Sequence, residues 1–181
     1  MKMSFEGLQR LFTFKMTPKQ YLLYQAFGSI AVNGGLTAAS MWPKRATLYV
    51  PFFGSSGIAA DTLITTFLIS SLTVVFGTLF IRRDYKTGRF DALAWTPRNH
   101  PLLNLFPYAV LGRAVMFGTL FTLAFAPATL GVFELAEIDG LVFRDFVIFK
   151  LLYAVIVGMI VTPLNALWVL TRPNPHGRTR P

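Results

Sequence analysis

One apolar stretch, residues 58–81, constrains the fold of this chain more than any other feature. Its only ionisable residue is Asp61, at the outer edge, and Arg82 and Arg83 follow its last residue. At about 1.5 Å per residue, a helix of this length crosses the roughly 30 Å hydrocarbon core of a bilayer. The stretch therefore predicts a transmembrane helix, and its two terminal arginines predict that this end faces the cytoplasm.

Small and hydroxyl-bearing residues recur along this stretch at the spacing of one helical face. They are Thr62, Thr66, Ser70, Thr73 and Gly77. Helices in lipid associate through such faces, because small residues let two backbones approach and a leucine gains little by exchanging lipid for protein. We therefore expect this face to pack against a neighbouring helix.

Further apolar runs extend the same interpretation to the whole chain. Hydrophobic residues make up 54% of the sequence and charged residues only 14%, whereas a soluble domain averages about 25% charged residues. The predicted fold class is an all-α membrane protein, with four transmembrane helices in an up-down bundle and an N-terminal interfacial amphipathic helix. The predicted membrane domain covers residues 17–171, with spans at about 21–42, 58–81, 106–133 and 146–170.

The segments outside the spans carry weaker signals. Residues 1–16 place their apolar side chains on one helical side, which favours an interfacial helix over a basic tail. Thr17 and Gln20 flank Pro18 in the pattern of a capping box, so we expect a helix to begin there. Residues 43–60 predict an external loop with aromatic side chains, and residues 172–181 predict a polar cytoplasmic tail.

The distribution of charge predicts the orientation. Most basic residues lie before the first span, in residues 82–105 and in the tail, whereas most acidic residues lie in the two opposite loops and their edges. The positive-inside rule then places both termini in the cytoplasm, and an even number of spans agrees. We expect an integral membrane protein, in a bacterial inner (plasma) membrane on the strength of this bias.

Several function classes are disfavoured by composition. The net charge is +9, but the basic residues flank the apolar spans. They therefore indicate the topology of the chain, and we expect no nucleic-acid partner. There are no cysteines, and His100 and His176 lie outside the spans, so we expect no metal and no cofactor. No phosphate-binding glycine loop or soluble hydrolase motif is present, which favours a non-enzymatic protein.

A set of polar residues and one proline form the candidate membrane site. Its members are Asn33, Ser70, Thr119, Thr122, Pro163 and Asn165. A polar layer could bind a small solute or an ion, or the same groups could hydrogen-bond between helices. No acidic residue reaches this depth, so the second interpretation is favoured.

Charged residues near the span ends are the other candidates. Arg113 lies about 10 Å inside its span by helical rise, which is within reach of snorkelling to the surface. Alternatively Arg113, with Arg82 and Arg83, contacts an anion or a lipid headgroup. Asp61 is expected to act as a first-turn acid at its helix end, with a coupling carboxylate as the alternative.

Three functions remain open on sequence grounds. The first is a non-enzymatic membrane protein that associates through its helices with itself, as a homo-oligomer, or with a partner membrane protein in the lipid bilayer. The second is a transporter or channel component with a mid-membrane polar site. The third is a membrane enzyme acting on lipid, for which His100 beside Arg98 is the only candidate pair.

Overall fold

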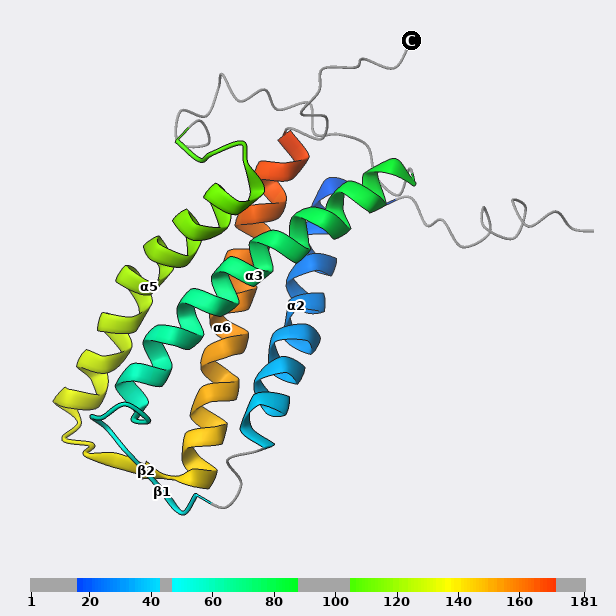
Figure 1. Ribbon diagram of the computed structural model, residues 1–181. Coiled ribbons are helices and arrows are strands. Elements are labelled where there is room, and N and C mark those ends of the chain that lie inside the picture. Colours follow the sequence, from blue (N-terminus) through cyan, green and yellow to red (C-terminus); the bar gives the residue numbers. More distant parts are fainter. Residues whose placement is uncertain (1–15, 43–46, 88–104, 172–181) are drawn as a thin grey trace, which may run out of the picture.

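The computed structural model of the 181-residue chain describes residues 16–42, 47–87 and 105–171 (Figure 1). The described part is mostly helical. Its elements, in chain order, are α2 (Pro18–Met41), β1 (Tyr49–Pro51), α3 (Ile58–Lys86), α5 (Val110–Leu135), β2 (Gly140–Val142) and α6 (Phe143–Thr171). The expected interfacial helix and the C-terminal tail lie outside the described residues.

Three of these helices, α3, α5 and α6, are long and apolar enough to cross a membrane. This confirms the prediction of a mostly helical chain that contains helices able to cross a membrane by their length and composition. Helix α2 occupies most of the expected first span at 21–42 but is not among the three. A fourth crossing by α2 therefore stays a proposal.

Helices α3 and α6 occupy the middle of the arrangement. Helix α5 packs on α3, and α2 packs on α6, so the order across the molecule is α5, α3, α6 and α2 (Figure 1). Successive helices run in opposite directions, which leaves the two central helices parallel to each other. The start of α2 and the end of α6 consequently lie at the same end of the molecule.

Helix α2 begins with the expected capping box. The Gln20 backbone N–H donates to Thr17 Oγ1 at 3.3 Å, and the Thr17 backbone N–H donates to Gln20 Oε1 at 3.0 Å. Each of these bonds satisfies a donor that the helix itself leaves without an acceptor. One turn further, the Tyr21 hydroxyl donates to Asp84 Oδ2 at 3.0 Å and ties the start of α2 to the end of α3.

A two-stranded antiparallel sheet joins the loops at the other end, where the sequence predicted only irregular chain. Tyr49 pairs with Val142 and Pro51 with Gly140. Phe52 is buried beside the strand, whereas Phe53 is exposed. The sheet covers an apolar cluster whose buried members are Met41, Val50, Phe52, Ile58, Phe133 and Phe146.

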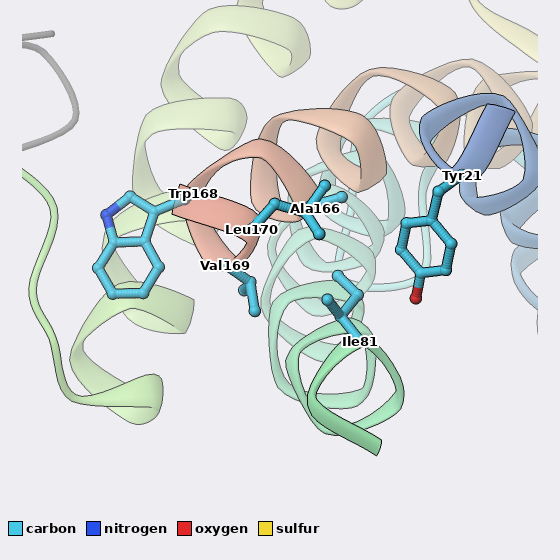
Figure 2. Packing of buried hydrophobic residues seen from close by; sticks show 6 residues of the cluster. All are labelled: Tyr21, Ile81, Ala166, Trp168, Val169 and Leu170. Atoms are coloured by element: carbon cyan, nitrogen blue, oxygen red, sulfur yellow. The ribbon is translucent and has the colours of Figure 1, made fainter. Parts of the chain in front are cut away.

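A second apolar cluster lies at the end of α6. Its buried members are Tyr21, Ile81, Ala166, Trp168, Val169 and Leu170. Figure 2 shows Trp168 on the α5 side of α6 and Tyr21, from α2, on the opposite side. The indole ring is therefore placed to meet side chains that α5 contributes.

Candidate functional site: the polar seam between α3 and α6

A series of polar contacts runs along the interface of the two central helices, and we call it the polar seam. It is formed by Asp61, Thr66 and Thr78 of α3 and by Lys150, Tyr153 and Asn165 of α6. The pairs Thr66–Tyr153 and Thr78–Asn165 are each 87 residues apart in sequence. The two helices therefore run in parallel, with nearly the same offset at both contacts.

At the sheet end of the polar seam the charges are paired. Lys150 Nζ lies 2.7 Å from Asp61 Oδ1, and Thr65 Oγ1 donates to Asp61 Oδ2 at 3.3 Å. The Lys150 side chain is almost fully buried, and its ammonium lies 5.9 Å from the Phe146 ring centroid. Asp61 is thus an ion-pair partner as well as the expected first-turn acid of α3.

In the middle of the polar seam the contacts are between neutral hydroxyls. Thr66 Oγ1 donates to the Thr62 carbonyl at 2.6 Å, and it lies 2.6 Å from the Tyr153 hydroxyl. Because the threonine hydroxyl has a single hydrogen, Tyr153 is the donor in the second bond. The Ser70 and Thr162 hydroxyls are buried without a hydrogen-bond partner.

At the opposite end, Arg113 of α5 joins the polar seam. Its side chain is 0% exposed. Arg113 Nη2 donates to Thr78 Oγ1 at 2.6 Å, and its Cζ lies 3.8 Å from the centroid of the Trp168 ring. The side chain thus points between helices, and the expected snorkelling to the surface is wrong. Its Nε and Nη1 are buried without a hydrogen-bond partner.

Thr78 connects Arg113 to α6. While its hydroxyl accepts from Arg113, it donates to Asn165 Oδ1 over 3.4 Å, and Asn165 Nδ2 donates to the Val74 carbonyl over 3.5 Å. These two bonds are long and weak. The strong interactions at this end are therefore the short Arg113–Thr78 bond and the stacking on Trp168.

Arg82 and Arg83 differ sharply although they are neighbours. Arg82 follows Thr78 by one helical turn and is half-buried, so it lies on the same side of α3 as the hydroxyl that Arg113 contacts. Its Nε is buried without a hydrogen-bond partner. Arg83 is exposed. Of the two, only Arg82 belongs with Arg113.

The residues of the predicted mid-membrane site lie in different interfaces. Asn33 packs from α2 against Gly158 of α6, where an added Cβ would overlap its amide, whereas Asn165 lies against Gly77 of α3. Thr119 is exposed on α5, where it faces away from the other helices. The Thr122 hydroxyl is buried without a partner, and Pro163 lies within α6, which continues on both sides of it.

The predicted small and hydroxylated face of α3 is partly right. Thr62, Thr66 and Ser70 are buried, as expected, but the buried line continues through Val74 and Thr78 and not through the half-buried Thr73 and Gly77. Val74 and Thr78 follow Ser70 at a spacing of four residues, so they stay on the same side of α3 as Thr62 and Thr66. Sequence reasoning therefore missed Thr78, which is the residue that Arg113 contacts.

Together these features describe a mostly helical chain that has three helices long and apolar enough to cross a membrane and whose two central helices are joined through polar side chains. Among the described residues, no group of three or more His, Cys, Asp or Glu is placed to hold a metal ion. The sequence matches no protein-family model, and comparisons with curated proteins and with solved structures find no significant match. The function is therefore inferred from the geometry alone.

Proposed function

We propose that this chain is a non-enzymatic integral membrane protein that acts by associating, through α2, with a second copy of itself. In this proposal α2 is a fourth crossing, the helices form an up-down bundle, and both termini face the cytoplasm. The charge bias of the sequence supports that orientation. The antiparallel course of successive helices supports the topology.

The observation that carries the proposal is the outer face of α2, formed by Gly28, Ala31, Gly35 and Ala39. All four residues are exposed and recur at helical spacing. A Cβ added to Gly28 or Gly35 would meet nothing within 4 Å. These small residues are therefore uncovered in the single chain, with the exposed side chains of Tyr24 and Val32 beside them.

The opposite side of α2 is already occupied. Ser29, Asn33 and Thr37 are buried along it, and Asn33 packs against α6. Helix α2 therefore directs its polar residues to α6 and its small residues outward. Because it is less apolar than the other three helices, contact with lipid stabilises it less, and a second helix on its outer face would compensate.

A second copy is the occupant that this chemistry favours. Small-residue faces pair with like faces, because each lets the other backbone approach closely, and a symmetric dimer uses the same patch twice. The polar seam also supports a structural role, since its side chains largely bond one another across the helix interface.

The experiment that tests the proposal measures the oligomeric state of Gly35→Ile. We expect light scattering of the detergent-solubilised protein to show a dimer for the wild type and a monomer for the variant. The control is Gly131→Ile on α5, where a Cβ also meets nothing within 4 Å. It should leave the dimer intact. A monomeric wild type or a dimeric Gly35→Ile variant would contradict the proposal. If the wild type instead purifies with an equal amount of a different subunit, and Gly35→Ile loses that subunit, the occupant of the face is a partner membrane protein.

A component of a transporter or channel is the alternative, and one observation favours it. Ser70 and Thr162 bury hydroxyls without partners inside the polar seam. The chain has no cysteine, so Ser70→Cys and Thr162→Cys can be probed with a charged, water-soluble thiol reagent. Labelling of both would support a hydrated path, with Ser55→Cys in the exposed loop as the positive control. The third candidate, an enzyme acting on lipid, depended on Arg98 and His100, which lie outside the described residues.

A further inference from the structure

The charge of Arg113 has no counter-charge within the described part of the chain. The side chain is fully buried, and its one hydrogen-bond acceptor is the neutral Thr78 hydroxyl. Trp168 contacts the face of the guanidinium but provides no acceptor for its N–H groups. Nε and Nη1 accordingly keep hydrogens that reach no acceptor. A buried cation in this state is strongly unfavourable unless something else neutralises it.

Arg82 adds a second charge at the same place. It lies on the same side of α3 as the hydroxyl that Arg113 contacts, and its Nε is also buried without an acceptor. No salt bridge of either arginine is found among the described residues. An anion between the two guanidinium groups would offset both charges and accept the hydrogens left over on both.

We propose that Arg113 and Arg82 bind a phosphate group, of a phospholipid headgroup or of a free phosphate ion. Phosphate matches the planar fork of a guanidinium and has enough oxygens to serve two arginines at once. Trp168 covers one face of the Arg113 guanidinium, so the phosphate approaches in the plane of the N–H groups. It reaches the site beside Arg82, whose side chain is only half-buried.

The position in the fold suits both sources of phosphate. Arg82 lies near the end of α3 that the sequence predicts at the cytoplasmic surface, which is the depth of lipid headgroups. Helix α2 contributes none of the groups named, so the site does not depend on the proposed dimer. Failure of one proposal therefore leaves the other standing.

The test uses the full chain in maltoside micelles, which contain no phosphate group. Thermal unfolding is followed while sodium phosphate, or phosphatidylglycerol mixed into the micelles, is added against sodium chloride of equal ionic strength. We expect a saturable rise of about 5 °C at a hundredfold excess over the dissociation constant. A rise with phosphate identifies the free ion as a ligand, and a rise with lipid alone identifies the headgroup. No rise with either overturns the proposal.

Matched variants decide whether the two arginines are responsible. Arg113→Gln and Arg82→Gln should each weaken the saturable rise at least tenfold in apparent affinity. Arg83→Gln removes the same charge from the exposed neighbouring position and should leave it unchanged. Equal losses in Arg82→Gln and Arg83→Gln would reduce the effect to surface charge and overturn the site. If Arg113→Gln does not fold, the half-buried Arg82 still provides the test.

Discussion

The two ends of the polar seam bury one cation each and treat it differently. Lys150 is 6% exposed and Arg113 is 0% exposed. Lys150 has the Asp61 carboxylate at 2.7 Å, whereas Arg113 has only the Thr78 hydroxyl and the Trp168 ring. At the sheet end the chain provides the counter-charge itself. At the other end the described residues provide none.

The choice of side chain agrees with this difference. An ammonium is a compact, strongly hydrated charge and is expensive to bury without a carboxylate. A guanidinium is more weakly hydrated and can stack on an aromatic face, which lowers the cost of burial without removing it. Lys150 therefore completes an internal bond, whereas Arg113 is placed to receive an acceptor from outside the chain.

The largest expected effect separates the two cations directly. Lys150→Met leaves the half-buried Asp61 carboxylate without its cation, so it should lower the free energy of unfolding by about 3 kcal/mol, the lower end of the range for a broken buried pair. Arg113→Met in phosphate-free micelles removes an unpaired buried cation, which offsets the lost stacking and hydrogen bond, so the cost should stay below about 2 kcal/mol. Unfolding by a denaturing detergent measures both, and equal losses would break the comparison.

A second substitution makes the two ends alike. Thr78→Asp places a carboxylate where the hydroxyl now accepts from Arg113. A hydrogen bond to a charged group contributes about 1.5–3 kcal/mol. In phosphate-free micelles the variant should therefore unfold at a higher concentration of denaturing detergent than the wild type. It should also lose the stabilisation by added phosphate. Thr78→Asn, of similar size and neutral, should gain nothing, and a Thr78→Asp protein that still responds to phosphate would count against the comparison.

The smallest effect is expected in the neutral middle of the polar seam. Tyr153→Phe removes the bond to Thr66, but Thr66 still donates to the Thr62 carbonyl. No buried donor is stranded, so the loss should be about 0.5–1 kcal/mol. The same unfolding measurement checks it. A loss above about 2 kcal/mol would mean that the middle contributes as much as the charged end.

The helices could be predicted because their signals are local. The pattern of Thr17, Pro18 and Gln20 predicted the start of α2, and the long apolar run predicted α3 from residue 58. A helix long enough to cross a lipid bilayer can be predicted from its own residues, without knowing which helices it packs against. The three apolar helices therefore appear within a few residues of the expected ranges.

The strands and the ion pair depend on residues that are far apart in sequence. Tyr49 and Val142 pair across about half of the chain, and each strand is only 3 residues long, too short for a pattern of alternation. Asp61 and Lys150 both lie near the starts of their helices, but their contact follows from the register of α3 on α6. That register is determined by how the two helices pack, and it cannot be predicted from the sequence of α3 or of α6 alone.

Arg113 shows the same limit within a single helix. Helical rise predicts a depth along the helix, but depth does not determine the direction of a side chain. The partner that fixes the direction, Trp168, is on another helix and was not a candidate. The asparagines Asn33 and Asn165 of the candidate polar set lie in two different interfaces, and each faces a glycine of its own neighbour.

The β1–β2 pair has a mechanical consequence. It fastens the connection between α2 and α3 to the connection between α5 and α6 by backbone hydrogen bonds at one end. The strand pair therefore limits how far the helix ends on this side of the molecule can move apart, because separating the two connections would break these backbone hydrogen bonds.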